Sequence, residues 1–228
     1  VTTKNLDYLM NNYYNDYPFD KDDFNTNDKE FIITSISETF ESSNFIFLEN
    51  TLIPFLVIND HFLDQNIYEI LKVSTNDYTG YFTEKFLKCR AIDINHNSKS
   101  SNNLSILESA LKNKNSRAVE KILKCPEIDL NTNGYQNKTP SILACLFDCD
   151  AKTINLICNH PNVINDFDSM LGYSGSCGNL NSVLFIIDHF GNRNFPVSND
   201  ILIDVTLKKR LYSLKVLLKY YLSRNENI

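Results

Sequence analysis

Twelve residues in the middle of the chain occur twice, as EKFLKCRAIDIN at residues 84–95 and as EKILKCPEIDLN at residues 120–131. The two copies lie 36 residues apart and differ at four positions. An internal match at a spacing of about 20–50 residues is typical of repeat proteins, whose units are each too small to bury their own apolar side chains. The sequence therefore predicts a stack of similar units, an arrangement that presents an extended binding surface.

A second pattern recurs in the same frame. Five six-residue segments each end in a small or short side chain, and their final residues are spaced by 36, 34, 30 and 31 residues. Apolar residues recur at steps of three and four within each unit, as a buried helical face requires. The final residues are Ser74, Ala110, Ala144, Ser174 and Val205. The expected buried faces are Leu107, Leu111, Ala118, Val119, Ile122 and Leu123 in one unit, and Leu214, Val216, Leu217, Leu218 and Tyr221 in the last.

Three segments resemble the ankyrin repeat, a unit of about 33 residues that opens with Thr-Pro-Leu-His-x-Ala. Residues 139–144, TPSILA, resemble this opening; residues 178–187, GNLNSVLFII, look like the approach to the second helix of the family's repeat. Residues 128–131, IDLN, are similar to the element that starts the finger between repeats. The resemblance covers about residues 66–222. It implies an all-α fold: an ankyrin-like helical solenoid of about five degenerate helix-turn-helix repeats.

The sequence also departs from this family pattern. The histidine of the opening segment is replaced by Glu108, Ile142, Gly172 and Ile203, so the hydrogen bonds that it orders in the family are not expected here. The junction at residues 162–167 is shorter than the preceding one, which predicts a stunted finger.

Several residue types fit helix starts and turns without reference to any family. Ser105 and Thr139 can accept a hydrogen bond from a free backbone N–H at a helix N-terminus, and Pro140 suits the first helical turn. Gly134 is expected to supply the turn at the finger tip.

Residues 1–65 are less regular and rich in Asn, Asp and aromatic residues. Helices are expected near residues 4–15, 28–41 and 45–58. The segment is interpreted as an atypical helical cap that includes one degenerate repeat, because the terminal unit of a stack must face water. A separate helical module before the repeats is the alternative. Residues 223–228 are expected to form a polar tail.

Composition disfavours two classes of partner. A net charge of −6 and a pI near 5.2 disfavour a nucleic-acid-binding face, and the densest basic run is only residues 208–210. The longest apolar run, residues 52–58, is far shorter than the roughly 18 residues that a membrane helix needs. No nucleic acid and no membrane are therefore expected as partners.

The six cysteines are predicted to be free thiols. Cys89 and Cys125 occupy equivalent positions in adjacent units, where helices pack about 8–10 Å apart, whereas a disulfide needs Cα atoms within about 7 Å. No CxxC pair or zinc spacing occurs. Free thiols fit an intracellular location, cytoplasmic or cytoskeletal.

No motif predicts catalysis or a cofactor. The sequence lacks HExxH, GxSxG and a Gly-rich phosphate loop. Cys177 stands in a segment faintly similar to a thiol-protease nucleophile, but the repeat register places it at a helix end. Residues 23–34 have the first oxygen ligands of an EF-hand but lack its Gly and its final Glu. The chain is expected to be no enzyme, with no metal and no cofactor.

The resemblance implies a protein-protein interaction or scaffolding module that binds another protein on a concave face made of first helices and finger tips. The alternative is a structural subunit of a larger assembly, for example a cytoskeletal or microtubule-associated one, contacted on several faces. The candidate partner-binding residues are Lys112, Asn113, Asn133, Tyr135, Gln136, Leu143, Leu146, Phe147, Phe167 and Tyr173. The register adds Asn97, Ser109, Ser176, Asp204 and Lys208.

Overall fold

The structure, a computed structural model, describes residues 68–89, 92–96, 102–191 and 197–225. The chain divides into two compact units, residues 1–77 and 78–228. The described part of the first unit is residues 68–77, of which residues 68–74 are helical. The helices expected within residues 1–65, the EF-hand-like segment and Asn97 lie outside the described residues.

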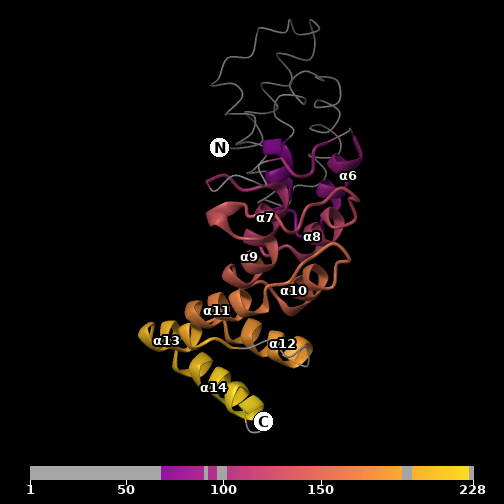
Figure 1. Ribbon diagram of the computed structural model, residues 1–228. Coiled ribbons are helices and arrows are strands. Elements are labelled where there is room, and N and C mark those ends of the chain that lie inside the picture. The colour runs from indigo at the N-terminus through magenta and orange to yellow at the C-terminus, as the bar shows by residue number, and fades with distance from the viewer. Residues whose placement is uncertain (1–67, 90–91, 97–101, 192–196, 226–228) are drawn as a thin grey trace, which may run out of the picture. The chain divides into compact units, whose positions relative to one another are not determined.

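All regular secondary structure in the described residues is helical, which confirms the all-α prediction (Figure 1). In the second unit, the helices that follow α6 form four consecutive pairs, α7–α8, α9–α10, α11–α12 and α13–α14. The helices are α6 (Tyr81–Cys89), α7 (Ile106–Lys112), α8 (Ser116–Ile122), the 3₁₀ helix η2 (Tyr135–Asn137), α9 (Pro140–Leu146), α10 (Ala151–Cys158), α11 (Phe167–Cys177), α12 (Leu180–Phe190), α13 (Asn199–Leu207) and α14 (Leu211–Asn225).

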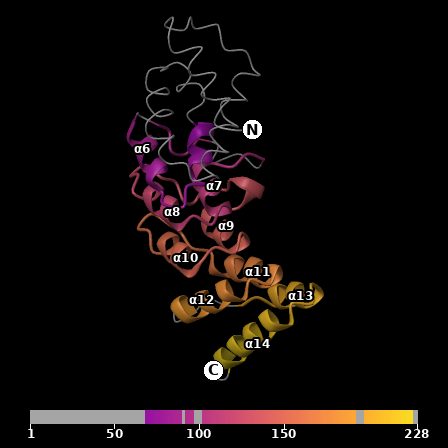
Figure 2. The same ribbon diagram turned by 180° about the vertical axis from the view of Figure 1, so that it is seen from behind.

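The pairs stack in two layers. The first helices α7, α9, α11 and α13 contact one another in succession, and so do the second helices α8, α10, α12 and α14, with α6 packed on α8. Figures 1 and 2 show these layers from the front and from behind. No helix within the described ranges combines the length and the apolar character needed to cross a bilayer.

Each first helix ends in the same way, with one residue in the left-handed region of backbone conformation. The next residue donates its backbone N–H to a carbonyl five residues earlier, as in a Schellman motif. The left-handed residues are Lys114 (φ 54°), Asp148 (φ 56°), Gly178 (φ 83°) and Lys209 (φ 56°). Their spacings of 34, 30 and 31 residues match those of the small residues in the sequence pattern. The sequence register therefore locates the helix ends correctly.

The final residues of the recurring segments lie where first helices pack together. Ala110, Ala144, Ser174 and Val205 are all fully buried. A Cβ on Gly175, beside Ser174, would lie only 2.9 Å from Val205 Cγ2. Small side chains at these positions therefore allow neighbouring first helices to approach closely.

One of the two predicted caps forms. Ser105 accepts a hydrogen bond from the backbone N–H of Glu108, and the Glu108 carboxylate accepts one from the Ser105 N–H, so the two residues make a capping box. Thr139 does not cap α9 with its side chain. Its hydroxyl lies instead 3.1 Å from the hydroxyl of Ser141.

The duplicated twelve residues make duplicated contacts. In each copy the final Asn, Asn95 or Asn131, follows a turn in which an Asp two residues earlier accepts its backbone N–H. The Asn side chain then pairs with the backbone of the next unit, donating to one residue and accepting from another at 2.7–2.8 Å. The bonded groups are Glu127 O and Asp129 N for Asn95, and Asn162 O and Ile164 N for Asn131.

The junction at residues 162–167 contains no counterpart of the loop at residues 132–139. Asp166 caps α11 directly by accepting the backbone N–H of Ser169 at 3.0 Å. The helix therefore starts at Phe167, which was expected to lie in a finger. Phe167 is instead buried, 9% exposed, and its ring stacks on that of Phe190 at 5.0 Å.

The expected buried faces are correct in the centre of the stack and wrong at its end. All six residues of the α7–α8 face are buried. Of the five predicted for α14, Leu217 is buried, Leu218 is 39% exposed and the others are half-buried. The reason is that α14 belongs to the last pair, and no further described helix packs against its outer side.

Candidate partner-binding face

Eight of the ten candidate partner-binding residues are accessible. Lys112, Asn133 and Gln136 are exposed, and Asn113, Tyr135, Leu146, Phe147 and Tyr173 are half-buried. They come from the C-terminal parts of α7, α9 and α11 and from the loop before α9, residues 132–139, which we call the finger loop. Since α7, α9 and α11 contact one another in succession, their equivalent ends form a row.

Two aromatic side chains meet on this face. Tyr135 starts η2 in the finger loop, and Phe147 is the C-cap of α9. Their ring centroids lie 6.3 Å apart at an interplanar angle of 36°, within the range of a favourable aromatic pair. Both side chains remain half-buried, so the pair keeps accessible apolar surface.

A lysine of the finger loop contacts a third aromatic ring, on the next first helix. The Lys138 ammonium, also from the finger loop, lies 4.7 Å from the centroid of the Tyr173 ring on α11. Cation–π contacts of this kind stabilise by about 0.5–1 kcal/mol at accessible sites. Sequence reasoning missed Lys138, because its contact with Tyr173 depends on how the loop crosses to the following pair. We name Tyr135, Lys138, Phe147 and Tyr173 together the aromatic face.

A buried carboxylate anchors the finger loop to the preceding unit. Glu108 on α7 is 2% exposed; its Oε1 accepts the backbone N–H of Tyr135 at 2.8 Å, and its Oε2 accepts that of Ser105 at 2.7 Å. Glu108 stands where the family pattern has histidine, and a network was not expected there. The carboxylate has two oxygens and so accepts from two separate backbone groups, one in its own unit and one in the next.

The tip of the finger loop is built differently from the prediction. Gln136 and Asn137 have φ of 52° and 57°, whereas Gly134 has φ of −106°. Gly134 instead closes the loop, because its N–H donates to Lys138 O at 2.9 Å. The left-handed pair therefore sets the turn and places Gln136 outward, where its side chain is exposed.

Side chains from the turns between first and second helices bridge consecutive pairs on the first-helix side. Cys149, Asn179 and Arg210 each follow a left-handed residue and donate to a carbonyl near the C-terminus of the preceding first helix. The accepting atoms are Leu111 O at 3.2 Å, Cys145 O at 2.7 Å and Ser176 O at 3.4 Å, respectively. These bonds hold the helix ends that carry the candidate face at a fixed spacing.

Two of the ten candidates, Leu143 and Phe167, are not accessible, and their prediction as partner-binding residues is wrong. Leu143 is fully buried in the middle of α9, and Phe167 is buried at the start of α11, so both belong to the core and offer no surface to a partner. The register candidates Ser109 and Ser176 are buried as well, at 6% and 4% exposed. Asp204 and Lys208 pair with each other at 3.1 Å on α13, outside the aromatic face.

Five of the six cysteines are free thiols, as predicted: Cys125, Cys145, Cys149, Cys158 and Cys177. Burial raises the pKa of Cys145 and of Cys149 to about 12, so both thiols stay protonated near neutral pH. Among the described residues, no cluster of three or more His, Cys, Asp or Glu side chains is arranged to hold a metal ion.

The chain matches no protein-family model, and no curated protein is similar to it in sequence.

Proposed function

We propose that the chain is an ankyrin-like protein-interaction or scaffolding module, whose partner protein binds on the aromatic face. The internal repeat, the paired helices and the recurring left-handed turns support the repeat assignment. The observation that carries the functional proposal is the Tyr135–Phe147 pair: both side chains are half-buried, their ring centroids lie 6.3 Å apart, and Glu108 anchors the finger loop that bears Tyr135.

The chemistry of the aromatic face suits a protein partner. Large aromatic side chains that are already partly ordered lose little conformational entropy on binding, and they are frequent hot spots in interfaces. Lys138 adds a positive charge beside Tyr173, and exposed Gln136 and Asn133 supply polar groups around the rings. An apolar centre with a polar rim is the usual anatomy of a protein–protein interface.

The test is a double substitution, Tyr135→Ala with Phe147→Ala. Tyr78→Ala is the matched control, because that side chain is 77% exposed and lies outside the aromatic face. Wild-type chain and both variants would serve as baits in affinity purification with quantitative mass spectrometry. Candidate partners would then be purified for titration against each variant.

A partner that binds the aromatic face should be retained by wild type and by Tyr78→Ala. Truncation of a hot-spot aromatic costs about 2 kcal/mol or more, so the double variant should bind at least about 30-fold more weakly. Circular dichroism and melting temperature should remain close to wild type. Equal retention of every partner by all three baits would refute the proposal.

A structural subunit of a larger assembly is the second candidate function. It is favoured by a second accessible apolar surface, on α13 and α14, where Leu207, Leu211 and Leu222 are 74%, 72% and 55% exposed. A subunit held on several faces would lose assembly when either surface is altered, whereas a single-face module would lose its partner only through the aromatic face.

A further inference from the structure

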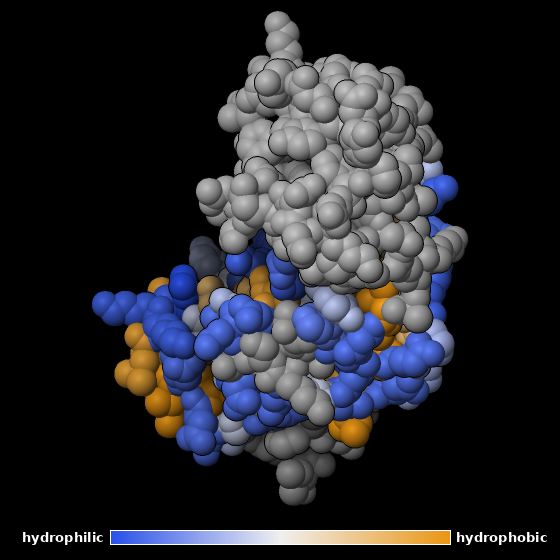
Figure 3. Space-filling view, turned by 90° about the horizontal axis from the view of Figure 1, so that it is seen from above, coloured by the Kyte–Doolittle hydropathy of each residue, from blue (hydrophilic) through white to orange (hydrophobic). Residues whose placement is uncertain are grey.

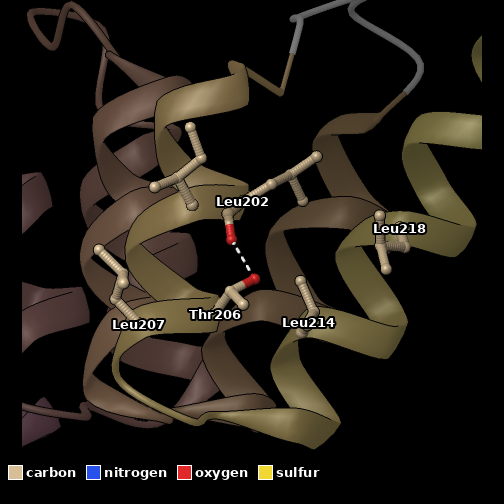
Figure 4. Close-up of a pocket in the computed structure, with 6 residues that line it drawn as sticks. Leu202, Thr206, Leu207, Leu214 and Leu218 are labelled. Atoms are coloured by element: carbon tan, nitrogen blue, oxygen red, sulfur yellow. Dashed lines mark hydrogen bonds between the residues drawn. The ribbon is translucent and has the colours of Figure 1, made fainter.

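The last helix pair carries an apolar groove of about 290 Å³ on its outer side (Figure 4). Its only polar lining side chain is Thr206, and the Thr206 hydroxyl already donates to Leu202 O at 2.6 Å within α13. The groove therefore presents almost entirely carbon to solvent. It is lined by Leu202, Ile203, Thr206 and Leu207 of α13 and by Leu214 and Leu218 of α14.

The side chains around the groove are unusually exposed for their type. Leu207 is 74% exposed, Ile203 56% and Leu218 39%. Figure 3 shows hydrophobic residues gathered on the side where α13 lies in Figure 1, with hydrophilic residues beside them. Contiguous apolar surface of this kind on a folded protein commonly marks an interaction site.

The repeat register indicates what shape of partner fits. With the offset of 31 residues between the last two pairs, Leu202 corresponds to Leu171 and Leu214 to Val183. Leu171 and Val183 are both fully buried, in the pair on which α13 and α14 pack. The groove is thus the same side of the unit that accepts helices elsewhere in the stack, so its shape suits an α-helix.

Charge restricts the partner further. Residues 199–222 carry five basic and two acidic side chains, although the whole chain has a net charge of −6. Lys215 and Lys219 are exposed, and each directly follows a groove residue of α14, Leu214 or Leu218, in the sequence. The two lysines therefore lie on the side of α14 next to the groove residues. The turn at residues 208–210 adds three more basic residues, of which Lys208 pairs with Asp204 on α13. The α14 flank and the turn are therefore basic, while Asp200 and Asp204 lie on α13.

We infer that the α13–α14 groove is a docking site for a partner protein that presents an amphipathic helix. The helix contributes an apolar stripe to the groove and acidic residues along the edge that faces Lys215 and Lys219. A second copy of the same end fits poorly where the two α14 flanks face each other, because that two-fold contact brings like charges together. The site is separate from the aromatic face and does not depend on the function proposed for it.

The experiment uses the full chain and two synthetic helical peptides of about 18 residues. Both peptides carry leucine at steps of three and four residues; one has glutamate along one edge of the leucine stripe, and the other has lysine there. Binding is measured by fluorescence anisotropy at low and at high salt. The glutamate peptide should bind about tenfold more tightly than the lysine peptide, and the difference should shrink at high salt because exposed charge pairs are screened.

Three variants test the site. Leu207→Ser with Leu218→Ser should abolish binding of the glutamate peptide, and Lys215→Glu with Lys219→Glu should reverse the preference between the two peptides. Tyr212→Ser, at a 79% exposed position that does not line the groove, should bind like wild type. Leu207 and Lys215 are both exposed, so the variants should keep the wild-type circular dichroism spectrum.

Two results would overturn the inference. If neither peptide binds, or both bind equally, the groove does not select an acidic amphipathic helix. If analytical ultracentrifugation shows a dimer of the wild type that Leu207→Ser converts to monomer, the occupant is a second copy of the chain.

Discussion

Replacing Glu108 should uncouple the finger loop from the stack. Its carboxylate accepts the backbone N–H groups of Ser105 and Tyr135 at 2.7 and 2.8 Å and is 2% exposed. Hydrogen bonds to a charged group contribute about 1.5–3 kcal/mol each, and the removal of the acceptor leaves two donors without a partner. The half-buried position of Tyr135 allows water to compensate in part. Glu108→Ala should therefore lower the free energy of unfolding by about 2–5 kcal/mol.

Two further variants separate the contributions. Glu108→Gln keeps one carbonyl oxygen but presents an NH₂ group to the other donor, so it should cost about 1–3 kcal/mol. Ser105→Ala removes only the 3.3 Å bond to the Glu108 N–H and should cost about 1 kcal/mol, as for other N-caps. Glu127→Ala, at an exposed position, is the control and should change stability by less than about 0.5 kcal/mol.

Urea denaturation gives these free energies, and amide hydrogen exchange at Tyr135 reports the loop directly. Exchange at this amide should become faster in Glu108→Ala than global destabilisation alone explains. A Glu108→Ala protein as stable as the Glu127→Ala control, or one in which Tyr135 keeps its excess protection, would show that the carboxylate does not hold the finger loop.

Two other predictions concern helix ends and buried thiols. Lys209→Gly should raise the free energy of unfolding by about 0.5–1 kcal/mol, because a lysine at φ 56° is strained and a glycine is not. The control Lys208→Gly, at φ −80°, should lower the free energy of unfolding by a similar amount. The reverse order of stability in thermal melts would contradict this account. Cys145 and Cys149, whose pKa is raised to about 12 by burial, should resist iodoacetamide at pH 8 until urea unfolds the chain, whereas half-buried Cys177 should react first. Rapid labelling of Cys145 in native buffer, detected by mass spectrometry, would contradict this expectation. Because these two thiols bind protons more tightly in the folded state, the free energy of unfolding should also fall as the pH rises above about 9.

Much of the candidate face was predictable because it follows the repeat register. The duplicated IDIN and IDLN segments indicated equivalent loops, and the fixed offset placed Phe147 at a first-helix end beside a finger that contains Tyr135. Leu143 was misassigned because the register gives its position along the helix but does not show how much of its side chain the neighbouring helices cover. Lys138 was missed because a loop lysine has no periodic signal, and only the crossing of the loop towards α11 brings it over Tyr173.

The sequence by itself determined the helical class, the spacing of the units and the positions of the helix ends. These follow from local pattern: apolar residues at steps of three and four, a small residue at the same position of each unit, and turn residues that recur at a fixed distance after it. Only the tertiary structure decided which faces are covered. Leu171 and Leu202 occupy equivalent positions with the same side chain, yet the first is fully buried and the second lines an open groove. Burial depends on whether another helix pair packs on top, and that is a property of the neighbours in space rather than of the residue's own segment.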